Sequence, residues 1–223
     1  MSQQESKKAI FKSLAEIAHA LSHHNRLELL EYLGQGQRSV EELASLSSLT
    51  FANTSRHLQI LRRARLVKTE RDGKYILYSL DGEDEVTNLI SSLGRVGERN
   101  NAEVQKIMRD YFHNRGTLQA VSQEELLKQL EAGEVTLLDV RPEHEYSVGH
   151  LPGALNIPLE QLKEKLSTLP KDQEIIAYCR GPYCMLSVEA LNFLKAQGFK
   201  VRRLEQGFPE WKAAGFDIEV SAA

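Results

Sequence analysis

The pattern of apolar residues changes once along this chain, and the change limits the folds that it can adopt. Up to about residue 113, apolar residues recur mainly at steps of three and four, which is typical of helices that bury one face. Beyond residue 120, short apolar runs such as Glu174–Tyr178 alternate with helical patterns such as residues 187–196. Strands that alternate with helices form parallel sheets. The sequence therefore predicts a largely helical N-terminal domain and an α/β C-terminal domain within 223 residues.

The first part of the chain has the order of elements of a winged helix-turn-helix. Helical spacing predicts two helices within residues 15–33, and a capping-box pattern at Ser39 opens a third. Thr50 can cap a fourth helix, and the Asp-Gly turn at residues 72–73 joins two strands of a hairpin, of which the second is Tyr75–Leu80. In a helix-turn-helix, the second helix of the motif enters the major groove of DNA.

The helix after Thr50 and the hairpin carry a basic, polar surface suited to DNA. Residues 50–75 hold seven basic and two acidic side chains, a net charge of +5 in a chain whose overall charge is −3. A local basic stripe of this kind complements the phosphates of a duplex. A solvated helix face would explain the charge, but not its agreement with the order of the elements. The expected contacts to double-stranded operator DNA come from Asn53, Thr54, Ser55, Arg56, His57 and Gln59 of the helix and from Arg71 and Lys74 of the hairpin.

Three stretches resemble the ArsR family of small bacterial repressors. They are residues 20–30 (ALSHHNRLELL), residues 39–44 (SVEELA) and residues 54–61 (TSRHLQIL), the last running into residues 64–67 (ARLV). The resemblance implies a homodimer, and many members of this family sense metals or thiol-reactive agents. Residues 41–46 hold no cysteine, so we expect no thiolate metal site there. The histidines, among them His23, His24 and His113, offer no complete ligand set, and we expect no metal site.

A long apolar stripe after the hairpin predicts a dimer helix. Its spacing indicates one long helix, or two helices broken near Gly94 and Gly97. The apolar positions are Val86, Leu89, Ile90, Leu93 and Val96, followed by Val104, Ile107, Met108 and Tyr111. A stripe of this length outside a compact core more often packs on a partner, so we expect a homodimer with recognition helices about 34 Å apart. The predicted domains are residues 1–100, a connecting helix at residues 101–116, and residues 117–223.

Cys179 occupies the position at which α/β sheets place their active sites. It directly follows the apolar strand Glu174–Tyr178 and opens a loop that leads into a helix. The backbone N–H groups of such a loop, with the helix N-terminus, lower the pKa of a thiol and favour a bound anion. Arg180 adds a positive charge next to it. A buried structural cysteine would share this pattern, so the pattern alone leaves both interpretations open.

Three further stretches resemble rhodanese domains and favour a reactive Cys179. They are residues 137–146 (LLDVRPEHEY), residues 149–159 (GHLPGALNIPL) and residues 204–211 (LEQGFPEW). The resemblance implies that Cys179 takes a sulfane sulfur from a donor, forms a persulfide and passes the sulfur to a thiol acceptor. It also implies that Asp139 and Arg141 help to hold the active-site loop.

The loop departs from the common rhodanese pattern at Cys184, where many members carry arginine. A phosphatase or arsenate reductase of this fold would need that arginine to hold its tetrahedral anion, so we expect neither activity. The loop instead holds two thiols five residues apart, which can meet if their Cα atoms lie within about 7 Å. Cys184 is expected either to resolve a persulfide on Cys179 into a disulfide or polysulfur bridge, or to pack beneath the loop.

Two functions are compatible with the sequence. In the first, the chain is a transcription regulator, expected to be a repressor, and sulfur on Cys179 alters its binding to DNA. In the second, it is a sulfurtransferase whose N-terminal domain serves dimerisation or localisation. A mere dimerisation module has no need of Ser55, Arg56, His57 or a basic hairpin, so the regulator is favoured. We expect no cofactor and, without a signal-peptide core or membrane-length apolar run, a cytoplasmic protein with no membrane partner.

Overall fold

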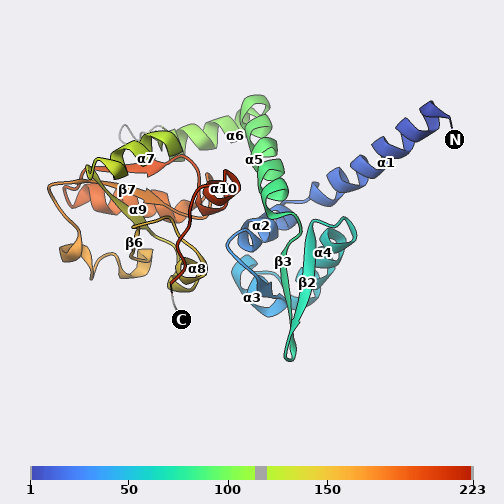
Figure 1. Cartoon of the computed structure of the whole chain (residues 1–223), viewed down its shortest axis with the longest axis horizontal. Helices are drawn as coiled ribbons and strands as arrows, with labels where there is room; N and C mark the ends of the chain where they lie inside the picture. The colour runs from blue at the N-terminus through green and yellow to red at the C-terminus, as the bar shows by residue number, and fades with distance from the viewer. Residues whose placement is uncertain (1, 114–119, 222–223) are drawn as a thin grey trace. The chain divides into compact units, whose positions relative to one another are not determined.

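A computed structural model of the chain describes residues 2–113 and 120–221, and Figure 1 shows its helices and strands. The chain divides into two compact units, Met1–Val86 and Thr87–Ala223. The first is built of helices and a small antiparallel sheet, and the second is an α/β unit with a parallel sheet. The fold class expected from the sequence is therefore confirmed.

The first unit is a winged helix-turn-helix. Its elements are α1 (Gln3–Leu21), α2 (His24–Leu33), β1 (Arg38–Ser39), α3 (Val40–Ser47), α4 (Phe51–Arg63), β2 (Val67–Asp72) and β3 (Tyr75–Leu80). Ser39 and Glu42 form a reciprocal capping box at the start of α3, and the Thr50 hydroxyl accepts the N–H of Asn53 at the start of α4. The turn between β2 and β3 requires Gly73, whose φ of 56° lies in the left-handed region. The sequence does not predict β1, because two residues are too few to show a strand pattern.

Helix α1 is longer than the apolar pattern indicates. It begins at Gln3 rather than near residue 15, because Ser2 and Glu5 form a second capping box. Three large apolar side chains on its outer turns are more than half exposed, so they do not follow the pattern of a buried face. These are Ile10, Phe11 and Leu14, exposed by 60%, 59% and 53%.

The connecting segment consists of three helical pieces. Helix α5 (Glu83–Asn100) runs through both Gly94 and Gly97, so the alternative with a break near these glycines is wrong. The chain breaks instead at Asn101, whose side chain caps α6 (Ala102–Ile107), and a π-helical turn, Met108–His113, follows. The division between the two units falls inside α5. The domain borders expected after residues 100 and 116 stay predictions, and the second lies outside the described residues.

The second unit holds a five-stranded parallel sheet in the order β4-β8-β7-β5-β6. Its elements are β4 (Ala120–Val121), α7 (Gln123–Glu131), β5 (Val135–Asp139), α8 (Glu143–Val148), β6 (Leu155–Asn156), η2 (Leu159–Gln161), η3 (Leu166–Thr168), β7 (Glu174–Tyr178), α9 (Met185–Ala196), β8 (Val201–Leu204) and α10 (Phe208–Ala213). The helix expected near residues 160–166 is wrong. Pro158 precedes one 3-10 turn and Lys165 precedes another, so the apolar residues of this segment reach the core in two separate turns.

Both faces of the sheet are buried, which explains why its strands are apolar throughout. Alternate residues of β7 enter different cores, because successive side chains of a strand point to opposite faces. Ile175 and Ala177 pack with α9 and with both cysteines, whereas Ile176 and Tyr178 pack with Phe208 and Trp211 of α10. The middle strand β7 is thereby fixed on both sides, and so is the start of the loop that follows it.

Candidate functional site

The two cysteines bracket a loop at the carboxyl end of β7, and residues 179–184 are called the reactive loop below. Cys179 is the first residue after β7, and Cys184 is the N-cap residue of α9. The structure joins them in a disulfide, with their Cα atoms 6.3 Å apart. Both side chains are buried, with exposures of 2% and 7%. The structure thus brings together two residues that the sequence places within reach of each other, and their chemical roles stay predictions.

Arg180 is held by a carboxylate that the sequence analysis does not single out. Its Nε and Nη2 donate to the carboxylate of Glu145 on α8 over 2.9–3.1 Å, and the Glu145 side chain is fully buried. A buried carboxylate needs such a partner, because desolvation of an isolated charge is costly. The charge of Arg180 is therefore balanced by Glu145, and it anchors the reactive loop to α8. Glu145 lies within a stretch that resembles rhodaneses, which is the only signal for it in the sequence.

Asp139 and Arg141 form a fully buried ion pair at the carboxyl end of β5, next to the reactive loop. The Arg141 Nη2 donates to Asp139 Oδ2 over 2.6 Å, and its Nε lies 3.1 Å from both carboxylate oxygens. Burial opposes the charge of Arg141, but Asp139 outweighs that effect and raises the pKa of the guanidinium. Asn156 donates to the backbone carbonyls of both residues. The turn after β5 is therefore rigidly held.

The guanidinium of Arg141 connects this ion pair to Cys179 through Phe208. The guanidinium carbon lies 4.3 Å from the centre of the Phe208 ring. The N–H of Phe208 donates in turn to the carbonyl oxygen of Cys179 over 3.1 Å. This path supports the expectation that Asp139 and Arg141 hold the loop.

Two further residues support the reactive loop and are absent from the sequence-based prediction. Arg203 of β8 is buried, and its Nη1 donates to the carbonyl oxygen of Pro182 over 2.7 Å. Burial lowers the pKa of Arg203. Gly207 lies so close to the backbone of Arg180 and Gly181 that no Cβ would fit. Gly207 belongs to a stretch that resembles rhodaneses, whereas the sequence around Arg203 carries no comparable signal.

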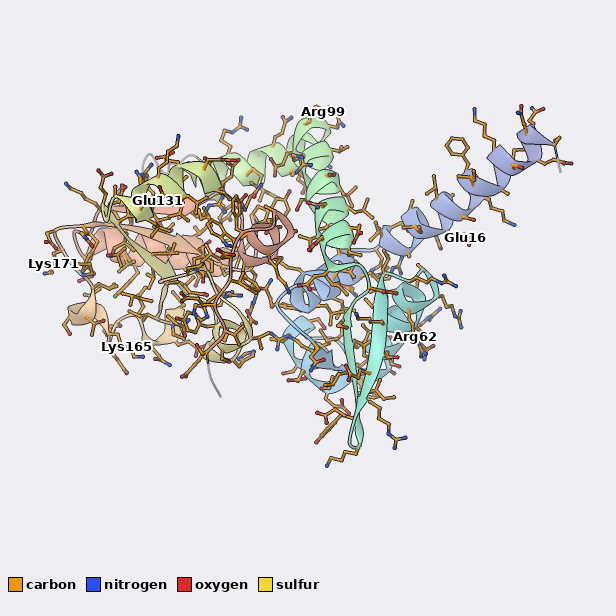
Figure 2. The ribbon with its side chains drawn as sticks, in the orientation of Figure 1. Glu16, Arg62, Arg99, Glu131, Lys165 and Lys171 are labelled. Carbon is orange, nitrogen blue, oxygen red and sulfur yellow. A yellow bond between two sulfur atoms is a disulfide. The ribbon has the colours of Figure 1, made fainter. Side chains whose placement is uncertain are left out.

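The recognition helix α4 exposes most of the side chains expected to contact DNA. Asn53, Arg56 and Gln59 are exposed and Ser55 is half-buried. Figure 2 shows the exposed side chain of Arg62 extending from the last turn of the same helix. Thr54 must be removed from the expected contacts, because it is fully buried and its hydroxyl donates to the carbonyl oxygen of Thr50 over 3.0 Å. It faces the core because it lies one helical turn from the buried Leu58.

The hairpin β2–β3 exposes both basic residues expected at its tip. Arg71 donates from Nε to the carbonyl oxygen of Gly73 over 3.1 Å, which stiffens the turn. The ammonium of Lys74 lies 5.1 Å from the centre of the Tyr75 ring. Both cationic groups remain exposed, as phosphate contacts would require.

His57 of α4 packs against the N-terminus of α2 and is only partly exposed. Its ring centre lies 4.6 Å from that of His23, and His24 stacks on His23 at 4.8 Å. Burial, followed by the neighbouring charges of His23 and Arg26, lowers the pKa of His57 and favours the neutral ring at pH 7. Within the described residues, no group of three or more His, Cys, Asp or Glu side chains could hold a metal ion. None of the described helices combines the length and the apolar character needed to cross a membrane.

Comparison with known proteins gives one match in each part of the chain and one across its whole length. Residues 23–69 match the family model "Bacterial regulatory protein, arsR family", and residues 122–214 match the model "Rhodanese-like domain". The HTH-type transcriptional regulator Rv0324 of Mycobacterium tuberculosis is 37% identical over 220 residues, which cover 99% of this chain and 96% of that protein. The putative sulfurtransferase YtwF of Bacillus subtilis is 34% identical over 96 residues, 43% of this chain and 91% of that protein.

Solved structures resemble each part separately. One is the homodimeric winged helix-turn-helix domain of a possible ArsR-family regulator from Mycobacterium bovis, 29% identical, with a TM-score of 0.42. It covers 46% of this chain and 94% of that chain. Another is a rhodanese-like domain from Anabaena, 34% identical, with a TM-score of 0.41, covering 46% of this chain and 79% of that chain.

Proposed function

Because this chain belongs to the ArsR family of bacterial transcriptional regulators and carries a rhodanese-like domain, we propose that sulfur loaded on Cys179 controls its binding to DNA. The observation that carries the proposal is the pairing of Cys179 with Cys184 in a chain that also exposes a basic recognition helix. We infer a repressor that releases its operator when sulfane sulfur accumulates.

The proposed chemistry needs only a sulfane-sulfur donor and the two thiols. The Cys179 thiolate attacks the sulfane sulfur of a polysulfide or organic persulfide, forms the Cys179 persulfide and releases the rest of the donor as a thiolate. The Cys184 thiolate then attacks the Cys179 sulfur, forming the disulfide and expelling HS⁻ with the bonding electron pair. The two thiols are thereby oxidised and the sulfane sulfur is reduced to sulfide. With Cα atoms 6.3 Å apart, the second step needs little movement of the loop.

Operator binding with and without a sulfane-sulfur donor tests this proposal. Reduced protein is titrated against the DNA upstream of its own gene in a gel-shift assay, and the titration is repeated after polysulfide treatment. We expect operator affinity to fall by roughly 5- to 150-fold, the usual range of allosteric coupling. Unchanged affinity, with the added sulfur detected by mass spectrometry, would contradict the proposal.

A homodimer is part of the same proposal, because the first unit offers one copy of each recognition element. Helix α1 exposes Ile10, Phe11 and Leu14, and α5 exposes Leu89, Leu93 and Val96. Exposed apolar patches of this kind mark interaction sites. A two-fold pairing of these helices would place two copies of α4 at successive major grooves.

Substitutions in α4 and in the hairpin are expected to weaken DNA binding in different ways. Arg56→Ala removes an exposed side chain that can reach base edges, so it should weaken the operator by about 1–3 kcal/mol and unspecific DNA less. Lys74→Ala removes a phosphate contact, so it should weaken all DNA and lower the slope of log K against log salt by about one. Thr54→Ser is the control, because Thr54 is buried and should not contact DNA. Equal binding of all three variants to every promoter fragment would refute the assignment of this surface.

Sulfur transfer to an external thiol is a second candidate function, favoured by the similarity of the second unit to a putative sulfurtransferase. It is compatible with the first, because one persulfide could serve both. An assay with thiosulfate as donor and an external thiol as acceptor separates them. Many sulfur atoms transferred per chain would indicate an enzyme, whereas a single atom per chain would indicate a sensor.

A further inference from the structure

The reactive loop rests against helix α5 within the second unit. The residues of α5 that meet the loop and its surroundings are Ser91, Gly94 and Glu98. Their spacing of three and four places them on one face of the helix. The exposed apolar residues of α5 lie about half a helical turn away from that face. They are Leu89, Leu93 and Val96, exposed by 41%, 43% and 46%.

Tyr183 makes the direct contact between the reactive loop and α5. Its hydroxyl donates to Oε1 of Glu98 over 2.9 Å. Its ring lies against the backbone of Gly94, where a Cβ would overlap the hydroxyl and crowd the ring. Burial and the hydrogen bond to Glu98 raise the pKa of Tyr183, so the hydroxyl keeps its proton at neutral pH. Because Tyr183 directly precedes Cys184, a shift of Cys184 must also shift the Tyr183 backbone.

A second series of contacts ties the other end of the loop to the same face of α5. The N–H of Phe208 donates to the carbonyl oxygen of Cys179, and Phe208 is the first residue of α10. Glu210 caps α10 by accepting the N–H of Gly207 over 3.0 Å, and its other carboxylate oxygen accepts the hydroxyl of Ser91 over 3.3 Å. Figure 1 accordingly shows α10 beside α5. Both ends of the reactive loop are therefore connected to one helix face.

We propose that Tyr183 is a positioning residue through which α5 responds to the bond between Cys179 and Cys184. The proposal rests on the proposed function for its chemistry. When the disulfide forms and HS⁻ leaves, the two sulfur atoms come to bonding distance and the backbone of Tyr183 moves with Cys184. When two external thiols reduce the bond, the sulfur atoms separate to van der Waals distance and the external thiols become a disulfide. The contact of Tyr183 with Gly94 and Glu98 differs between the two states.

Helix α5 is well placed to carry this difference along the chain. It begins at Glu83, three residues after the hairpin strand β3 ends at Leu80. Its exposed apolar face is part of the proposed dimer surface, on which the spacing of two recognition helices depends. A small rotation of α5 would therefore alter operator binding without any contact between sulfur and DNA.

Gly94→Ala and Gly97→Ala form a matched pair that tests the contact. Both replace a helix glycine with the best helix former, but the new methyl group would meet Tyr183 only at Gly94, since nothing lies within 4 Å at Gly97. Full-length wild type and both variants are treated with polysulfide, the disulfide is verified by mass spectrometry, and the Kd for the operator is measured. We expect Gly97→Ala to keep the wild-type change in Kd and Gly94→Ala to form the disulfide with a change below about twofold. A full response in Gly94→Ala overturns the inference.

Tyr183→Phe is a milder variant that removes only the hydroxyl bound to Glu98. Coupling is reciprocal, so operator DNA must shift the reduction equilibrium of the disulfide by the factor by which the disulfide shifts operator affinity. A factor of about 5 to 150 corresponds to about 20–65 mV for this two-electron couple. We expect the full shift in wild type and Gly97→Ala, and a smaller one in Tyr183→Phe and Gly94→Ala. An undiminished shift in Tyr183→Phe and Gly94→Ala would contradict the role of Tyr183.

Hydrogen exchange separates failure of this inference from failure of the proposed function. If wild-type operator affinity does not respond to sulfane sulfur, the proposed function fails. Amide protection over residues 87–100 is then compared between reduced and disulfide-bonded full-length protein. A difference in wild type and Gly97→Ala that disappears in Gly94→Ala supports the contact through Tyr183. Equal protection in both states of wild type overturns it.

Discussion

Cys179→Ser protein is expected to bind the operator with the affinity of reduced wild type and to lose the response to sulfane sulfur. A serine hydroxyl does not form a persulfide at neutral pH, so the change of roughly 5- to 150-fold in operator affinity should disappear. Serine keeps the size of the side chain, which is 2% exposed, so the second unit should still fold. Fluorescence anisotropy with labelled operator, before and after polysulfide treatment, measures the response.

Cys184→Ser is the matched control for this prediction. It keeps the thiol that is expected to accept sulfur and removes the thiol that is expected to resolve it. Mass spectrometry should therefore find a lasting persulfide on Cys179 in this variant and no added sulfur in Cys179→Ser. Added sulfur that survives unchanged in Cys179→Ser would place the reactive thiol elsewhere. A wild-type response of operator affinity in Cys184→Ser would show that the persulfide alone is sufficient and that Cys184 does not resolve it.

Asp139→Ala is expected to cause the largest loss of stability in the second unit. The carboxylate and the guanidinium of Arg141 are both fully buried, and the substitution would leave Arg141 charged without Asp139. Breaking a buried ion pair from one side typically lowers the free energy of unfolding by about 3–5 kcal/mol. Because Arg141 stacks on Phe208, which donates to Cys179, the same variant should also accept sulfur more slowly.

Glu125→Ala provides the control of the same chemical type. Glu125 pairs with Arg202 over 2.6 Å, but its side chain is 46% exposed, so its loss should lower the free energy of unfolding by less than about 1 kcal/mol. Trp211 is the single tryptophan and is 1% exposed in the second unit, so its fluorescence reports unfolding of that unit in urea. Equal midpoints for the two variants would contradict the structural role of the Asp139–Arg141 pair.

Local signals in the sequence determine most of the elements and their order. The capping boxes at Ser39 and the N-cap at Thr50 start helices where the sequence places them, and Gly73 turns the hairpin. Each of these signals acts within three or four residues of the chain, so no knowledge of tertiary contacts is needed. The failures have the same origin. Two-residue strands such as β1 have no periodicity to detect, and the segment after Pro158 meets the core in two turns although its apolar spacing suits a helix.

The sequence by itself determined two parts of the candidate site: a strand that ends at Cys179 and a second thiol five residues later. Only the tertiary structure decided the partners of the charged and polar groups around them. Glu145 reaches Arg180 across 35 positions, Tyr183 reaches Glu98 across 85, and Ser91 reaches Glu210 across 119. The parallel sheet order β4-β8-β7-β5-β6 requires crossover connections, and these bring distant segments to one edge of the sheet. Periodicity encodes which face of an element is buried, but the pairing of buried charges depends on which elements become neighbours, as it also does for Thr54, whose polar side chain the core of the first unit encloses.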